Sequence, residues 1–214
     1  MGNTSFILDC DGVILDSNNL KLSVVREVLL EMHEIFPKNK IKEAVTDFQN
    51  NFGKSRYWHV KNMEKLIPGS KKGFSERFVT RYSEILKPKY LQSNLCKGVE
   101  NFLMTTSNQK FVVSGSNEEE LREVFRKKDL QKYFMKILGS PKSKSENIAA
   151  IIEGFKGDFI YIGDSVEDFK ASEENNIEFI FLKQYSLVPQ KLMKLSMIKG
   201  FKVCESWSQF SHNG

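Results

Sequence analysis

Two aspartates stand two residues apart at the end of the first apolar run of the chain. In the stretch SFILDCDGVILDSN, residues 5–18, Asp9 and Asp11 come directly after that run, and Asp16 follows shortly. Like-charged carboxylates this close raise one another's pKa unless a cation lies among them. Carboxylate oxygens with few histidines suit Mg²⁺, a hard cation that keeps several waters and partners with phosphate. The stretch therefore predicts a divalent-cation site.

Polar side chains also mark the ends of three later apolar runs. Ser114 lies near the end of KFVVSGS, and Lys142 and Lys144 follow MKILGS. Asp164 lies near the end of DFIYIGDS, and Asp168 comes four residues later. In an open parallel sheet, ligands bind beyond the carboxyl ends of the strands. We therefore expect these groups to converge with the first two aspartates on one rim of a sheet.

Stretches with helical periodicity separate these apolar runs. The run at residues 110–116 is followed by NEEELREVFRKKDL, in which apolar residues recur at helical spacing, and the later runs continue the same alternation. Apolar strands that alternate with helices imply a parallel sheet covered on both faces. The predicted fold class is α/β, with a doubly wound, Rossmann-like parallel sheet at its core.

One block of the sequence breaks the alternation. Residues 18–92 are almost entirely helical in pattern and contain no clear strand. We predict an α/β core domain formed by residues 1–17 and 93–214, and an inserted α-helical domain, residues 18–92, that lies over the sheet. After Leu182 the sequence predicts a late helix, followed by either a short edge strand or a docking tail.

The composition narrows the class of partner. The chain has 214 residues, is 40% hydrophobic and carries a formal net charge of +5, with its basic residues scattered rather than grouped. This pattern does not favour nucleic acid as a partner. The three cysteines form no C-x-x-C pair and predict reduced thiols, and no apolar run approaches the length of a membrane span. We expect a cytoplasmic protein without a membrane partner, and the oligomeric state stays open.

Four motifs together resemble those of the haloacid dehalogenase superfamily. They are DCDGVILDS, VVSGS, the lysine near GSPKSKSEN, and IGDSVED, and they follow one another in the order that the family has. The resemblance runs from about Ser5 to Leu182. The helical block after the first motif resembles the cap of the subgroup that contains phosphoglycolate phosphatases and beta-phosphoglucomutases. By this resemblance the fold is the family's α/β core with an inserted cap.

The resemblance implies a role for each acid and for the serine. Asp9 would be the nucleophile that forms an aspartyl-phosphate, and Asp11 the general acid and base. Ser114 would hydrogen-bond the phosphoryl oxygens. Asp164 would bind Mg²⁺ together with Asp9 and the main-chain carbonyl of Asp11. Asp168 would be a metal ligand or an acid that supports the ligands. A purely structural role, as an acid in the first turn of a helix that the helix dipole favours, accounts for Asp168 equally well.

The phosphoryl group also needs a lysine and small residues near it. Lys144 fits the form GSPxxK that the family often shows, whereas Lys142 fits the offset of the form KPxP but lacks its prolines. We favour Lys144 as the catalytic lysine and keep Lys142 as a substrate-binding candidate. Gly115 and Ser116, which follow the serine of the second motif, are expected to contact the substrate as well.

The remaining candidates lie in the first loop and in the helical block. Gly12 is expected to provide a tight bend near the metal. Asp16 and Ser17 match the family's extended first motif, but we favour a helix cap for them. In NFGKSRYWHV, residues 51–60, Arg56 is the candidate clamp for an anionic substrate group, with a solvated turn as the alternative. His59 is expected to be a packed or exposed residue rather than a catalytic one.

These expectations together predict a Mg²⁺-dependent phosphatase that hydrolyses a small phosphomonoester, such as a sugar phosphate, through an aspartyl-phosphate. A phosphosugar mutase uses the same four motifs and is the nearest alternative. The presence of Asp11 argues against a dehalogenase, because dehalogenases of the family generally lack the second acid. A non-catalytic binding protein with this fold is the remaining alternative.

Overall fold

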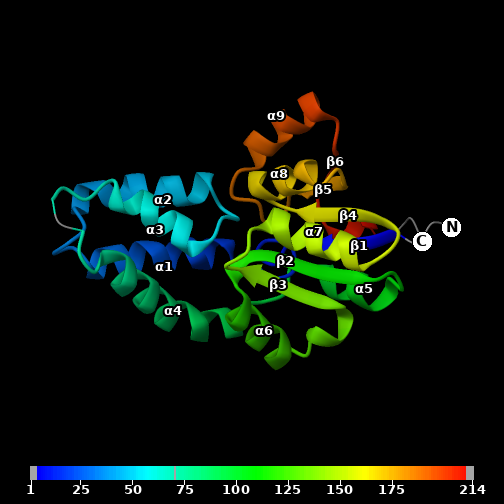
Figure 1. Cartoon of the computed structure of the whole chain (residues 1–214), viewed down its shortest axis with the longest axis horizontal. Helices are drawn as coiled ribbons and strands as arrows, with labels where there is room; N and C mark the ends of the chain where they lie inside the picture. The colour runs from blue at the N-terminus through cyan, green and yellow to red at the C-terminus, as the bar shows by residue number, and fades with distance from the viewer. Residues whose placement is uncertain (1–3, 70, 211–214) are drawn as a thin grey trace.

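A six-stranded parallel sheet forms the centre of the computed structural model, which describes residues 4–69 and 71–210 (Figure 1). The outer ends of the predicted core domain, residues 1–3 and 211–214, lie outside the described residues. The strand order is β3-β2-β1-β4-β5-β6. The strands are β1 (Thr4–Leu8), β2 (Lys110–Asn117), β3 (Lys136–Ser140), β4 (Asp158–Gly163), β5 (Glu178–Leu182) and β6 (Lys202–Cys204). The order reverses at β1, so β2 and β4 flank the strand that leads into the first two aspartates.

Successive residues of the strands pack against opposite layers, because side chains alternate between the two faces of a strand. Ile7 belongs to a buried cluster with residues of α7 (Lys144–Gly154), α8 (Val166–Glu174) and α9 (Pro189–Lys199). Leu8 belongs to a second cluster with residues of α5 (Val99–Thr105) and α6 (Glu118–Lys127). Helices therefore cover both faces, and the predicted doubly wound α/β fold is confirmed.

Four helices between β1 and α5 form a lobe beyond the carboxyl ends of the central strands (Figure 1). They are α1 (Asn18–Glu31), α2 (Ile41–Asn50), α3 (Arg56–Glu64) and α4 (Phe74–Gln92). Helix α1 packs on α2 and α4, and α3 packs on α4. Aromatic rings fill much of the interior; those of Phe36 and Phe74 stack with centroids 5.6 Å apart. We call this lobe, residues 18–92, the helical block, and its standing as a separate domain stays a prediction.

The segment after β5 docks on the core. Strand β6 pairs with β5 in parallel as the edge strand, and the 3-10 helix Trp207–Phe210 follows it. The Trp207 side chain is fully buried, and its Nε1 donates a hydrogen bond to the main-chain oxygen of Val13 at 2.8 Å. Both alternatives predicted for the tail are therefore present, and the tail braces the loop after β1. No helix among the described residues is long and apolar enough to cross a membrane.

Candidate active site

The loop after β1 brings two strand ends close together. The main-chain oxygen of Cys10 accepts hydrogen bonds from the nitrogens of Ile14 and Leu15 at 2.8 and 2.9 Å, which folds the loop back on itself. Gly12 has φ +77°, and a Cβ there would lie 2.2 Å from Oδ2 of Asp164. Only glycine tolerates this combination of a left-handed backbone and a close approach. The bend at Gly12 thus allows the loop after β1 to pass close to the Asp164 carboxylate.

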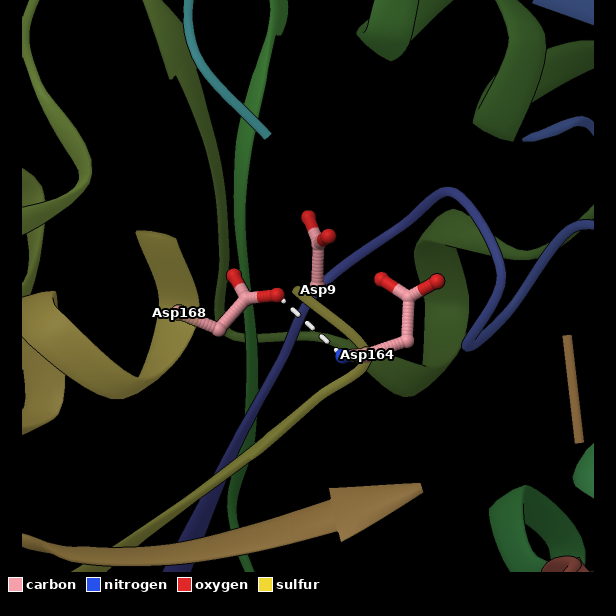
Figure 2. Close-up of side chains that lie close together, drawn as sticks. All are labelled: Asp9, Asp164 and Asp168. Atoms are coloured by element: carbon pink, nitrogen blue, oxygen red, sulfur yellow. Dashed lines mark hydrogen bonds between the residues drawn. The ribbon is translucent and has the colours of Figure 1, made fainter. Parts of the chain in front are cut away.

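Three buried carboxylates meet at these strand ends. Ligand atoms of Asp9, Asp164 and Asp168 lie within 4.8 Å of one another, although the residues come from the ends of β1 and β4 and from helix α8. Each of the three is at most 2% exposed. In Figure 2 the carboxylates of Asp9 and Asp164 point to the same side, while an oxygen of Asp168 is turned toward the main-chain nitrogen of Asp164. These three acids therefore lie together at one edge of the sheet, as the sequence predicts.

Both carboxylate oxygens of Asp168 are engaged by the protein. Oδ1 accepts hydrogen bonds from Lys144 Nζ at 2.5 Å and from the Tyr161 hydroxyl at 2.7 Å. Oδ2 accepts from the Ser165 hydroxyl and nitrogen, at 2.6 and 2.9 Å, and from the Asp164 nitrogen at 3.2 Å. Ser165 and Asp168 form a capping box that starts α8. This arrangement favours a positioning role for Asp168 over direct contact with a metal or a substrate.

Asp9 and Asp164 each keep one buried oxygen without a hydrogen-bond partner among the described residues, namely Oδ1 in both. Burial, together with the neighbouring charge of Asp168, raises the pKa of Asp9 to about 7, although Lys144 opposes the shift. Burial and the charge of Asp9 also raise the pKa of Asp164. Unpaired buried carboxylate oxygens are costly unless a cation satisfies them. The two residues therefore fit a hard divalent cation such as Mg²⁺, which takes oxygen ligands.

A buried lysine neutralises part of this acidic cluster. Lys144 Nζ lies 3.0 Å from Asp9 Oδ2 and 2.5 Å from Asp168 Oδ1. Burial alone would lower the pKa of Lys144, but the two aspartates outweigh it and raise the pKa. A capping box between Ser143 and Glu146 begins α7 and places Lys144 in the first turn. Lys142, the other lysine predicted for the site, is exposed and does not line the cavity described below.

Asp11 is held by a residue that the sequence reasoning missed. Lys21, one turn into α1, donates to Asp11 Oδ2 at 2.5 Å and to the Ser116 hydroxyl at 2.7 Å. Ser17 donates to Asp11 Oδ1 at 2.6 Å. Burial raises the pKa of Asp11, but the charge of Lys21 and these hydrogen bonds outweigh it, so the net pKa is lowered. The four-residue spacing of Ser17 and Lys21, which puts them on one face of a helix, was the signal in the sequence.

The helix cap predicted in this loop is confirmed in its position but not in its hydrogen bonding. Ser17 occupies the N-cap position of α1, but its side chain makes no capping hydrogen bond there. Its hydroxyl donates to Asp11 instead. Asp16 is exposed at the start of the same turn. The hydrogen bond that the Ser17 hydroxyl donates to the Asp11 carboxylate is stronger than one that it would accept from a backbone N–H, because hydrogen bonds to a charged group are the stronger class.

The end of β2 supplies the small polar residues of the second motif. Ser114 is buried, and its hydroxyl accepts a hydrogen bond from the Ser116 nitrogen at 3.2 Å. The Ser116 hydroxyl lies 3.0 Å from Asp11 Oδ2. A Cβ at Gly115 would lie 2.3 Å from the main-chain oxygen of Gly53, so the helical block touches the core here. All three residues line the same cavity as Asp9 and Asp11.

Two ion pairs join the helical block to the core near that contact. Arg56 forms a bidentate pair with Glu120 of α6, in which Nη1 lies 2.9 Å from Oε1 and Nη2 donates to Oε2. Lys54 Nζ lies 2.9 Å from Glu167 Oε2 at the start of α8. Arg56 does line the cavity as the sequence predicted. Its guanidinium is bound to a carboxylate of the protein, however, and is therefore not free to clamp an anion.

The cavity between the block and the strand ends has a volume of about 40 Å³. This volume is enough for a few water molecules. Its walls combine residues of the strand ends with residues of the helical block: Asp9, Asp11, Ser114, Gly115, Ser116 and Lys144 from the first, and Lys21, Phe48, Phe52, Gly53, Lys54, Arg56, His59 and Tyr82 from the second. Sequence reasoning did not place His59 here, because no motif marks it.

Comparisons with known proteins show which families and structures this chain is similar to. The sequence profile of the family described as haloacid dehalogenase-like hydrolase matches residues 6–182. No curated protein matches the chain in sequence. The fold is similar to that of a predicted phosphatase from Clostridium acetobutylicum, at 16% identity and a TM-score of 0.77, over 98% of this chain and 96% of that one.

Two further solved structures share the fold. One is a predicted phosphoglycolate phosphatase from Haemophilus somnus, at 12% identity and a TM-score of 0.72, over 96% of this chain and 95% of the other. The other is CbbY from Rhodobacter sphaeroides, solved with xylulose-(1,5)bisphosphate, at 10% identity and a TM-score of 0.70, over 97% and 95% of the two chains. At these identities the likeness concerns the fold.

Proposed function

Because the chain belongs to the haloacid dehalogenase-like hydrolases, we propose that this hydrolase is a Mg²⁺-dependent phosphatase acting on a small phosphomonoester through an aspartyl-phosphate. The observation that carries the proposal is the pair of unpartnered buried oxygens on Asp9 and Asp164, with Lys144 3.0 Å from Asp9. A cation and a phosphoryl group are the species that such a set of groups accommodates. The helical block would serve as the cap over this site.

Asp9 acts as the nucleophile in the proposed first step. One of its carboxylate oxygens forms a bond to phosphorus while the bond from phosphorus to the ester oxygen breaks. Lys144 Nζ, next to Asp9, stabilises negative charge on the phosphoryl group. The Ser114 hydroxyl and the Gly115 and Ser116 segment lie at the same cavity wall and orient the phosphoryl oxygens. Asp11 gives its proton to the departing oxygen, which leaves as an alcohol.

Asp11 takes a proton back in the second step. A water molecule attacks the phosphorus of the aspartyl-phosphate, Asp11 accepts its proton, and the bond between phosphorus and Asp9 breaks to release inorganic phosphate. Asp11 is a carboxylate at this stage, because it has given its proton to the departing alcohol in the first step. Lys21 and Ser17 fix the position of its two oxygens. Asp168 holds Lys144 and acts through it.

A bound Mg²⁺ would be held by Asp9, Asp164 and the main-chain oxygen of Asp11, as the family resemblance implies. It would supply positive charge against the phosphoryl oxygens and offset repulsion between Asp9 and the substrate. Asp168 contributes to this site by fixing the main-chain nitrogen of Asp164 at 3.2 Å. This makes it a supporting residue in the proposed metal site rather than a ligand.

Release of phosphate from a panel of phosphomonoesters, with Mg²⁺ and with EDTA, tests the proposal. We expect Mg²⁺-dependent release by the native protein and a loss of at least a thousandfold in Asp9→Asn, because the nucleophile is removed. Asp16→Asn, an exposed aspartate in the same loop, is the matched control and should keep full activity. Isomerisation of a phosphosugar that needs a bisphosphate activator, with little phosphate released, would replace the phosphatase by a mutase.

A further inference from the structure

His59 is buried against the proposed site with no polar partner. It lies on α3, is 2% exposed and lines the cavity together with Asp9. Neither Nδ1 nor Nε2 has a hydrogen-bond partner in the part of the chain that the structure describes. Buried polar atoms without partners are rare in folded proteins and cost stability. Both nitrogens of the His59 ring lack a partner, and the ring lies beside a cavity. These two facts point to a ligand in the cavity that supplies the missing hydrogen-bond partners.

The ring is held in place by aromatic neighbours. Its centroid lies 4.0 Å from that of Phe48 and 5.3 Å from that of Trp58, which meets it edge-on. Burial, helped by the positive charge of Lys54, lowers the pKa of His59 to about 3. The imidazole is therefore neutral, with one nitrogen that donates and one that accepts. A hydroxyl group, which can also both donate and accept, matches such a ring.

The charges around the cavity disfavour a second anionic group on the ligand. Each of the four cations in the cavity wall is already paired with a carboxylate. Lys21 pairs with Asp11, Lys144 with Asp9 and Asp168, Lys54 with Glu167, and Arg56 with Glu120. A carboxylate or second phosphate would have to displace one of these partners, and truncating or displacing one member of a buried pair is costly.

Aromatic rings of the helical block also form part of the cavity wall. Phe48, Phe52 and Tyr82 line the cavity and are 5%, 6% and 3% exposed. Carbon atoms of a ligand gain from contact with these rings, while its polar atoms need a hydrogen-bond partner, and the two ring nitrogens of His59 are unpaired among the described residues. This side of the cavity faces the catalytic groups from the helical block, where the alcohol part of a phosphomonoester would lie.

We propose that His59 is a specificity-determining residue that hydrogen-bonds a hydroxyl group on the alcohol part of the substrate. The site then selects monophosphates of small neutral polyols or sugars over esters that carry a carboxylate or a second phosphate. This inference rests on the proposed phosphatase function and assigns its substrate class. The proposed substrate class differs from that of a phosphoglycolate phosphatase, whose substrate carries a carboxylate, and from that of an enzyme that acts on bisphosphates.

Binding to the Asp9→Asn variant tests the inference without turnover. The probes are monophosphates of linear polyols with three to six carbons, the unbranched alkyl phosphate of equal carbon number for each, and phosphoglycolate, with Mg²⁺ present. By titration calorimetry, at least one polyol phosphate should bind about tenfold more tightly than its alkyl partner and than phosphoglycolate. The alkyl phosphates are matched controls because they differ only in the hydroxyl groups.

Substitution of His59 then shows whether this residue makes the distinction. In the Asp9→Asn background, His59→Phe keeps an aromatic ring against Phe48 and should abolish the tenfold preference, whereas His59→Gln should restore part of it. In the active enzyme, His59→Phe should lower kcat/KM for the polyol phosphate about tenfold more than kcat/KM for the alkyl phosphate. A variant that is merely misfolded would weaken both ligands together.

Two results would overturn the inference. One is tighter binding of phosphoglycolate than of every polyol phosphate, and the other is an equal effect of His59→Phe on polyol and alkyl phosphates. Failure of the underlying function is seen separately, with para-nitrophenyl phosphate as a generic substrate. If the native protein binds a polyol phosphate with the expected preference but releases no phosphate from any ester, hydrolysis is refuted and the assignment of the binding site is not.

Discussion

The buried histidine makes the stability of the protein depend on pH in a way that can be calculated. The pKa of His59 is lowered from 6.5 to about 3 in the folded state. The unfolded chain therefore binds a proton below pH 6.5 that the folded protein does not, and folding stability falls as the pH falls from 6.5 toward 3. Above pH 6.5 the ring is neutral in both states and contributes no pH dependence.

The size of the effect follows from the two pKa values. Between pH 8 and pH 5 the protonation of the unfolded histidine lowers the free energy of unfolding by about 2 kcal/mol, at about 1.4 kcal/mol for each pH unit below 6.5. His59→Phe removes the titrating group while keeping an aromatic ring beside Phe48. We expect the native protein to lose about 2 kcal/mol more than this variant over the same pH range.

Urea unfolding at pH 8 and pH 5 measures this difference directly. Carboxylates also titrate near pH 5, but they are common to both proteins and cancel in the comparison. His33→Gln, at an exposed histidine, is the control and should keep the pH dependence of the native protein. If His59→Phe and the native protein lose equal stability, His59 has a polar partner or water contact in solution, and the argument for its role in binding substrate fails with it.

Three further substitutions test the contacts that build the site. Lys144→Met should lower the free energy of unfolding by about 3–5 kcal/mol in metal-free protein, because it leaves buried carboxylates uncompensated; unchanged urea stability would contradict the ion-pair geometry. Arg56→Leu alone should destabilise the protein, and the double variant Arg56→Leu with Glu120→Leu should destabilise it less. A double-mutant cycle should give a coupling free energy of about 1–3 kcal/mol between the two residues. Strictly additive effects would show that the pair does not form. Trp207→Ala should lower the free energy of unfolding by about 3–5 kcal/mol, measured by thermal or urea unfolding. A decrease of less than about 1 kcal/mol would mean that the tail is not docked.

The fold and the acidic cluster were predictable because both follow from local patterns. Apolar runs bounded by polar residues predict parallel strands, and the carboxyl ends of such strands meet at one edge. Asp9 and Asp164 follow β1 and β4, which are direct neighbours with Leu8 opposite Ile162. Lys144 could be favoured over Lys142 from the sequence, and the capping box at Ser143 shows why the chain turns into a helix just before it.

Residues of the helical block could not be placed in the same way. Helical periodicity predicts which face of a helix is buried but not what that face contacts, so the spacing of Lys21 from Ser17 did not identify Asp11 as its partner, and His59 carried no signal of its own. Arg56 was predicted to hold an anion, and the anion it holds is Glu120, 64 residues later in the chain. Helix α4 runs through Pro88 to Gln92, because packing outweighs local propensity there: Tyr90 is 2% exposed and its hydroxyl lies 3.2 Å from Cys10 Sγ.

The volume of the cavity, taken with the proposed substrate class, predicts that the helical block moves to admit substrate. Sites for small molecules generally enclose about 300–1,000 Å³, whereas this cavity has about 40 Å³, so a polyol phosphate cannot reach Asp9 while the block stays where it is. Four ion pairs among the described residues join the block to the core: Arg56–Glu120 and Lys54–Glu167, with side chains 10–26% exposed, the more exposed Lys87–Glu123, and the buried Lys21–Asp11. The first two pairs keep some contact with water, so breaking them costs less than breaking a fully buried pair. The buried pairs of Lys144 with Asp9 and Asp168 lie entirely within the core and are unaffected by such a movement. The buried Lys21–Asp11 pair joins α1 of the block to the core, so we expect separation of these two residues to be the costly part of any opening.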